Sequence, residues 1–121
     1  MSSKLSSQML KGILSGCILV LLSKETLYGY TLGVELAKIG FENIPKGTIY
    51  PLLLNLEKKG LIYGESVPSP DGPKRKYYHL TEQGIAEKEN FIQEWQLLKT
   101  NVEWMLGKDD WDEYNGNDWI E

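Results

Sequence analysis

The sequence has little cysteine, little histidine and no long apolar run. Its 121 residues include one cysteine, Cys17, and one histidine, His79. One cysteine cannot form a disulfide within the chain, so we expect a reducing compartment and a Cys17 side chain buried as a small apolar group. The apolar stretch at residues 13–22 is shorter than the roughly 20 residues that a transmembrane helix needs, and the polar start of the chain does not resemble a signal peptide. These features predict a cytoplasmic protein with no membrane segment.

Residue patterns that support catalysis are also missing from the sequence. It contains no recognisable nucleophile triad, no glycine-rich phosphate loop and no cluster with metal-ligand spacing. His79 has neither a cysteine partner nor a clear carboxylate partner, and we interpret it as a surface residue. The sequence therefore predicts neither an enzyme nor a bound cofactor or metal.

The charges are unevenly distributed along the chain. The formal net charge of −4 argues at first against a nucleic-acid partner. However, residues 1–80 hold ten Lys/Arg and six Asp/Glu, residues 81–106 hold two and five, and residues 107–121 hold one and six. The first part of the chain is therefore cationic and suited to nucleic acid, because the acidity is C-terminal.

Two apolar helices are expected in the first third of the chain. Residues 8–22 are apolar on most of one side, and Gly12 and Gly16 on that side indicate that another helix approaches closely. Residues 29–38 form the second helix, which ends near Gly40. Its inner face is expected to carry Leu32, Leu36 and Ile39.

Residues 48–59 have the spacing of an amphipathic helix, and Gly60 ends it. The apolar positions are Ile49, Leu52, Leu53 and Leu56, with Leu54 at the edge of the core. The other face carries side chains that can donate to phosphates or base edges. These are Thr48, Tyr50, Asn55 and Lys58, with Lys46 just before the helix. Pro51 is expected in the first helical turn, where its missing N–H costs little.

A β-hairpin is expected next. Two strand-like runs, at residues 61–67 and 74–80, flank the turn-forming residues 68–73, which predict a long hairpin tip. Along the second run, alternation turns Tyr78 and Leu80 inward and Tyr77 and His79 outward. Three consecutive cations begin this run, and such a cluster is tolerable only in water or beside phosphates. They are Lys74, Arg75 and Lys76.

A long amphipathic helix is predicted after Thr81, a good N-cap residue. Its apolar side chains follow a heptad-like spacing. One stripe is Phe91, Trp95, Leu98, Val102 and Met105, and a parallel one is Ile92, Trp95, Lys99, Val102 and Leu106. Since little of the chain is left to cover these stripes, we expect the helix to form a homodimer.

A helix followed by a hairpin with a basic start is the layout of a winged helix-turn-helix, which binds double-stranded DNA. We therefore predict a mainly α fold with a small β-hairpin wing and a long C-terminal dimerisation helix. The expected parts are a DNA-binding domain at residues 8–80, the dimerisation helix at residues 81–106 and an acidic mobile tail at residues 107–121. Trp111, Tyr114 and Trp119 are unusual in such a tail and are expected to dock somewhere.

Three motifs resemble the PadR family of bacterial transcriptional regulators in its short-chain form. They are Tyr28-Gly29-Tyr30, the segment at residues 47–62 beginning Gly-Thr-Ile-Tyr-Pro-Leu-Leu, and the segment at residues 72–84 beginning Gly-Pro-Lys-Arg-Lys-Tyr-Tyr. The resemblance covers about residues 8–106. One departure is Asn55, where many members have Arg or Lys.

The resemblance implies a homodimeric winged-helix repressor whose long C-terminal helix packs on the partner's first and last helices. It thereby adds Ile13 and Cys17 to the expected dimer interface. Trp95 lies at the position of a tryptophan in the multidrug-responsive branch, in which two such residues sandwich planar aromatic drugs. This implies an aromatic small-molecule effector at Trp95, Ile92 and Val102, although an aromatic residue in such a stripe is more often core or interface.

Two other functions remain open at this point. The fold could act as a protein-interaction module whose wing docks an acidic partner. Alternatively, the protein could sequester small molecules while its acidic tail occupies the cationic face. Binding to promoter DNA without sequence preference at physiological salt would favour the interaction module. Deletion of residues 107–121 should strengthen DNA binding if the tail competes for the cationic face.

Overall fold

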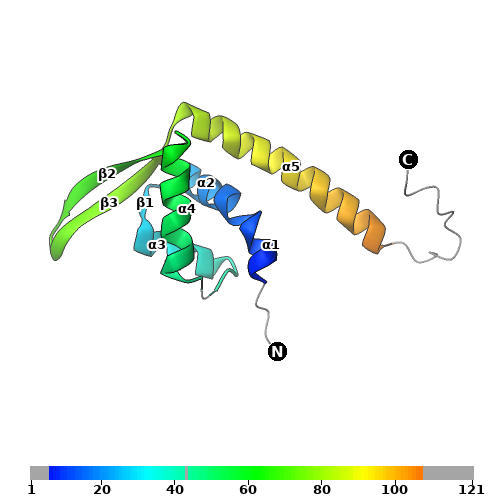
Figure 1. Ribbon diagram of the computed structural model, residues 1–121, viewed down its shortest axis with the longest axis horizontal. Helices are drawn as coiled ribbons and strands as arrows, with labels where there is room; N and C mark the ends of the chain where they lie inside the picture. Colours follow the sequence, from blue (N-terminus) through cyan, green and yellow to red (C-terminus); the bar gives the residue numbers. More distant parts are fainter. Residues whose placement is uncertain (1–5, 43, 108–121) are drawn as a thin grey trace, which may run out of the picture. The chain divides into compact units, whose positions relative to one another are not determined.

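The computed structural model describes residues 6–42 and 44–107. These belong to two compact units, of which one ends at Phe91 and the other begins at Ile92. The first unit contains most of the regular elements, drawn in Figure 1. They are α1 (Ser7–Lys11), α2 (Leu14–Lys24), β1 (Leu27–Tyr28), α3 (Gly29–Lys38), α4 (Lys46–Lys58), β2 (Ile62–Ser69) and β3 (Gly72–Leu80). The last helix, α5 (Glu82–Leu106), begins in the first unit and continues through the second.

The core of the first unit is built from the apolar faces of α2, α3 and α4 and from one face of the sheet. Its fully buried side chains are Leu14, Ile18, Leu19, Leu32, Leu36 and Leu53. Leu27, Ile62 and Tyr78, which lie on the strands, complete this core. Because burying one such side chain contributes about 1.5–3 kcal/mol, this core determines which face of α4 turns outward.

The first predicted helix is in fact two helices, so the single helix over residues 8–22 was wrong. The chain breaks at Gly12 and Ile13, because glycine is a poor residue for a helix interior. The close approach predicted at Gly16 is confirmed, since a Cβ atom there would lie 2.1 Å from Cδ1 of Phe91. At Gly12 no other part of the described chain comes within 4 Å of such a Cβ atom, so a close approach there stays a prediction.

α3 follows the prediction except at its end. The hydroxyl of Thr31 accepts the N–H of Tyr28 at 3.0 Å and thereby caps the start of the helix. Leu32 and Leu36 are buried as predicted, but Ile39 is 57% exposed. The helix ends at Lys38, so Ile39 is its C-cap residue and lies beyond the last helical turn. The positive φ of 108° at Gly40 then redirects the chain.

The wing belongs to a three-stranded antiparallel sheet with strand order β1-β3-β2. β1 was not predicted, because its two residues are too few to show a strand pattern. They pair with β3, Leu27 with Tyr78 and Tyr28 with Tyr77. The tip is shorter than predicted, since β2 and β3 continue to Ser69 and Gly72 and leave only residues 70–71 between them. Proline cannot donate to a strand ladder, and Pro68 is tolerated because the register is irregular between Val67 and Ser69.

The junction between β3 and α5 is tightly bonded. The hydroxyl of Thr81 accepts the N–H of Gly84 at 3.0 Å, which confirms Thr81 as the N-cap, and it donates to the carbonyl of Gly60 at 2.6 Å. Gly84 is buried, and a Cβ atom there would lie 2.0 Å from the carbonyl oxygen of Leu61. The contact explains why glycine stands where a capping box would place Glu or Gln.

Candidate nucleic-acid interface

The outward face of α4 carries the side chains that the sequence predicted. Lys46, Thr48, Tyr50, Asn55 and Lys58 are all exposed, whereas Ile49, Leu53 and Leu56 are buried. α4 begins two residues earlier than predicted, so Pro51 lies inside the helix instead of in its first turn. Proline has no backbone N–H, so Pro51 cannot donate the helical hydrogen bond to the carbonyl of Gly47, four residues earlier. Leu54, placed by prediction at the edge of the core, is 54% exposed.

Tyr50 rests on the start of α3. A Cβ atom at Gly29 would lie 2.6 Å from Cε1 and 2.8 Å from the hydroxyl oxygen of Tyr50. The middle residue of the Tyr-Gly-Tyr motif therefore leaves room for the Tyr50 ring. With 46% of its surface still exposed, Tyr50 presents a phenol beside the polar face of α4.

The three consecutive cations of the wing have different surroundings. Lys74 is exposed and, among the residues that the structure describes, has no ion-pair partner. The guanidinium carbon of Arg75 lies 4.7 Å from the centroid of the Tyr28 ring. The ammonium of Lys76 lies 3.2 Å from Oε1 of Glu57 on α4. Of the three, only Lys76 has a carboxylate partner within the described part of the chain.

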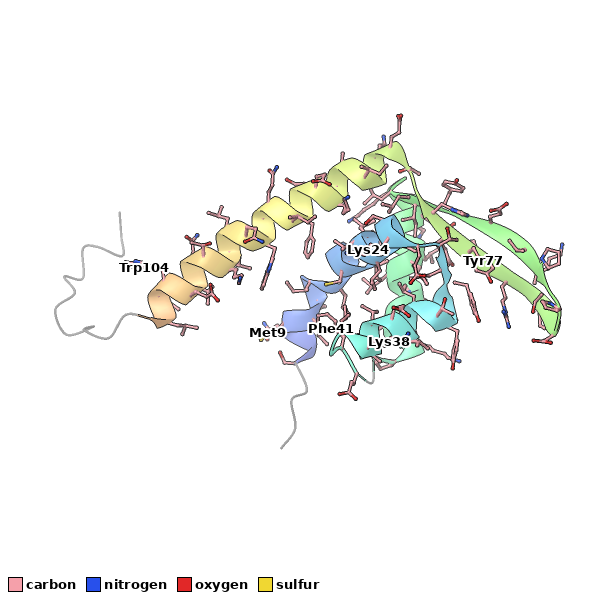
Figure 2. The ribbon with its side chains drawn as sticks, turned by 180° about the vertical axis from the view of Figure 1, so that it is seen from behind. Met9, Lys24, Lys38, Phe41, Tyr77 and Trp104 are labelled. Atoms are coloured by element: carbon pink, nitrogen blue, oxygen red, sulfur yellow. The ribbon has the colours of Figure 1, made fainter. Side chains whose placement is uncertain are left out.

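The outward face of the sheet is aromatic. Figure 2 labels Tyr77 on β3, and its ring contacts that of Tyr28 edge to face, with centroids 5.1 Å apart. Tyr63 stacks on His79 with centroids 5.0 Å apart. The burial of Tyr78 confirms the predicted alternation, with Tyr78 inward and Tyr77 and His79 on the opposite face.

His79 does have a carboxylate partner, so the expectation of none was wrong. Its Nε2 lies 3.1 Å from Oε1 of Glu65 on β2. The register pairs His79 with Tyr63 and Glu65 with Tyr77, so Glu65 is a diagonal neighbour across the hairpin. No short-range signal in the sequence could indicate this pair before the register was known.

Two groups in the first unit have altered acidities. Burial raises the pKa of the Tyr78 phenol, and the nearby Lys76 ammonium partly opposes this increase. Burial also raises the pKa of the Cys17 thiol, whose side chain is half-buried and packs against the core. At neutral pH Cys17 is therefore a protonated thiol, in agreement with its predicted role as a small apolar residue.

The part of α5 in the second unit exposes the predicted apolar stripe. Trp95 is 41% exposed, and Ile92, Leu98 and Val102 are exposed as well. A shallow pocket of about 360 Å³ lies towards the helix end, at which Figure 2 labels Trp104. Asn101, Val102, Trp104 and Met105 line it, so of the three predicted effector residues only Val102 does so.

The predicted dimerisation residues of the first unit are partly buried. Phe91 packs on Gly16 of its own chain, and Ile13 and Cys17 are of intermediate exposure. Their contribution to a dimer, like the DNA-binding and effector roles assigned above, stays a prediction. The tail with Trp111, Tyr114 and Trp119 lies outside the described residues.

Residues 6–42 and 44–107 contain no group of three or more His, Cys, Asp or Glu residues that could hold a metal ion. No helix within these ranges is long and apolar enough to span a membrane.

The chain is similar to known regulators over most of its length. A crystal structure of a PadR-like transcriptional regulator from Bacillus cereus is 48% identical, with a TM-score of 0.78, and the match covers 85% of this chain and 100% of that one. A Streptococcus transcriptional regulator is 45% identical, with a TM-score of 0.74, over 83% of this chain and 98% of that one. An uncharacterised protein from Lysinibacillus sphaericus is 31% identical over 80% of this chain and 91% of its own length.

The family assignment follows from one further match. The sequence model of the Transcriptional regulator PadR-like family matches residues 18–90, from α2 through the sheet into α5. Members of this family regulate transcription through DNA and are not enzymes. The chain therefore belongs to the PadR-like family of transcriptional regulators.

Proposed function

We propose that this regulator is a homodimeric repressor that binds a pseudo-palindromic operator. In this proposal α4 of each protomer is the recognition helix and enters the major groove with Lys46, Thr48, Tyr50, Asn55 and Lys58. The two recognition helices then read half-sites about one helical turn apart, roughly 34–36 Å. Because its partner is DNA, we place the protein in the cytoplasm.

The observation that carries this proposal is the exposed polar face of α4 in the same compact unit as a cationic wing. Lys74 and Arg75 extend the positive charge along the hairpin, and the sequence predicted Lys76 there as well. Each phosphate that a cation neutralises contributes a slope of about −0.9 to the dependence of log affinity on log salt. The wing therefore supplies affinity, while the helix supplies readout of the bases.

A footprint on the DNA that flanks the protein's own gene tests this function, because local regulators commonly act there. We expect protection of two half-sites with a common spacing, and competition by that fragment but not by shuffled DNA at physiological salt. Binding without any sequence preference would overturn the proposal and favour a protein-interaction module.

The exposed stripe on α5 supports the dimer. Trp95, Leu98 and Val102 form an exposed apolar surface on the part of α5 that belongs to the second unit. An isologous interface between two copies would bury it and set the spacing of the recognition helices. Sedimentation velocity of the whole chain should show a dimer at micromolar concentration.

We further propose that planar aromatic molecules bind at Trp95, with Ile92 and Val102 beside it, and weaken DNA binding. The exposure of Trp95 supports this role, because an indole face can stack on a flat ligand and attract a cationic one. Ligand and DNA must then weaken each other's affinity by the same factor.

Quenching of tryptophan fluorescence by a planar cationic dye tests the effector site. Trp95→Ala should abolish tight dye binding, while the matched variant Trp104→Phe should retain it. Tight dye binding by a Trp95→Ala variant that is still dimeric would refute the site.

A further inference from the structure

The course of the Lys76 side chain is determined by contacts to three elements. Its ammonium lies 3.2 Å from Oε1 of Glu57 on α4 and 5.6 Å from the centroid of the Tyr78 ring on β3. Its stem crosses β2 at Gly64, where a Cβ atom would lie 2.1 Å from Cε of Lys76 and 2.9 Å from Cγ. A side chain that merely pointed into solvent would not need a glycine beneath it.

Of these contacts, only the one with Glu57 is an ion pair between the wing and α4. Its side chain is 24% exposed and that of Lys76 is 48% exposed, so water screens the pair only in part. A carboxylate at this distance neutralises the ammonium that the sequence assigned to a phosphate. Lys74, two residues closer to the tip, has no such carboxylate partner among residues 6–42 and 44–107.

We propose that Glu57 and Lys76 form a strut that fixes the angle between the wing and α4. Glu57, Lys76 and Gly64 are then positioning residues for DNA binding, and Lys76 is not a phosphate ligand. The inference rests on the proposed function, because a fixed angle matters only if helix and wing bind DNA together. It adds Glu57 and Gly64 to a site in which neither was assigned a role.

The proposed strut predicts different effects on operator binding and on binding to unrelated DNA. A recognition helix and a wing held at one angle meet a groove and its neighbouring phosphates without losing conformational freedom on binding. Loss of the strut should therefore weaken binding to the operator, where both elements engage. It should leave the affinity for unrelated DNA unchanged, because that affinity comes from phosphate contacts alone.

A double-mutant cycle on the full-length protein separates the two roles of Lys76. We expect Glu57→Gln to weaken operator binding about twofold to fivefold, the range for a partly exposed ion pair, without changing the salt slope. Lys76→Met should do the same, and the double variant should be no weaker than either single one. Gly64→Ala should reproduce Glu57→Gln by displacing the Lys76 stem.

The control is Glu65→Gln, which removes the same charge from the other face of the hairpin and should leave operator binding unchanged. The opposite result would overturn the proposal. If Lys76 is a phosphate ligand restrained by Glu57, then Glu57→Gln strengthens binding to all DNA and steepens the salt slope by about 0.9 for each protomer.

A measurement without DNA keeps the strut testable even if the proposed function fails. Nitroxide labels at Leu54→Cys on α4 and Asp71→Cys at the wing tip, in a Cys17→Ala chain diluted with unlabelled protein, report the helix-to-wing distance by pulsed electron resonance. Adding Glu57→Gln should broaden the distance distribution, whereas adding Glu65→Gln should not. An unchanged distribution refutes the strut, while a wild-type protein without sequence preference refutes only the proposed function.

Discussion

At the scale of single residues, glycines decide where elements approach each other. Gly84 admits the carbonyl of Leu61, Gly16 admits the Phe91 ring, and Gly29 admits Tyr50. None of these three has a positive φ, so their role is space for a neighbour instead of backbone freedom. A substitution at such a site tests packing directly.

Gly84→Ala should lower the free energy of unfolding by about 1–3 kcal/mol, the usual cost of overpacking. The added Cβ would overlap a backbone oxygen, which cannot move aside as a side-chain end can. Urea denaturation at one fixed protein concentration measures the change.

The control is Gly33→Ala in α3, whose Cβ would lie an ordinary 3.5 Å from Cδ1 of Ile49. That variant should be neutral or up to about 1 kcal/mol more stable, because alanine favours a helix over glycine. A stabilised Gly84→Ala protein would show that the start of α5 is not held against Leu61.

The raised pKa values of Tyr78 and Cys17 predict how the free energy of unfolding changes at alkaline pH. Folding raises the pKa of both groups above their ordinary values of 10.0 and 9.0. The folded state therefore binds their protons more tightly, so their contribution to stability is present below pH 9 and is lost as the pH rises through the folded pKa values.

Thermal unfolding followed between pH 8 and pH 11 tests this dependence. Tyr78→Phe, which keeps the ring, and Cys17→Ala should each flatten the decline above about pH 9. A decline of the same steepness in both variants would assign the alkaline loss to other groups.

At the scale of the elements, α5 carries an exposed apolar stripe that includes Trp95, Leu98 and Val102. A carboxylate placed in the middle of its stripe would be buried without a partner if two copies meet there. Leu98→Glu should therefore raise the dimer dissociation constant at least about thirtyfold, equivalent to about 2 kcal/mol. Gln93→Glu adds the same charge on the opposite side of the helix and should leave the dimer intact.

Sedimentation velocity over a range of concentrations gives both dissociation constants. Operator binding should fall together with dimerisation, because a monomer engages one half-site. A Leu98→Glu protein that stays dimeric would place the interface elsewhere.

At the scale of the whole molecule, charge is segregated along the chain. Residues 108–121 hold six acidic residues and one lysine, so their deletion raises the formal net charge from −4 to +1. We expect stronger DNA binding at low salt, because less negative charge then repels the phosphates.

The difference in DNA affinity between the shortened and the full-length protein should decrease as salt increases, since the screening length falls to about 10 Å at 0.1 M. Mobility shifts at several salt concentrations measure it, and a chain of full length with amides in place of the acidic residues is the control. An affinity that the deletion leaves unchanged at every salt concentration would show that this segment does not affect DNA binding.

Much of the fold followed from local signals in the sequence. The buried face of α4, the hairpin with inward Tyr78, and Thr81 as the N-cap of a long helix were all predicted and are confirmed. The exposed positions of α4 that we propose for DNA follow from the same helix periodicity. Helix periodicity, strand alternation and capping depend on residues within a few positions of each other, so the sequence shows them directly.

The tertiary structure alone decided what depends on distant residues meeting. It revealed β1 on the edge of the sheet, Glu65 beside His79, and Glu57 holding the ammonium of Lys76. In each case the partners are 14 or more residues apart, as Glu65 and His79 are, and sequence spacing says nothing about strand register or helix docking. The sequence by itself determined most of the elements and the family, because local patterns encode them. Which cation of the wing has a carboxylate partner was decided only by folding, because a charge is neutralised according to what packs beside it.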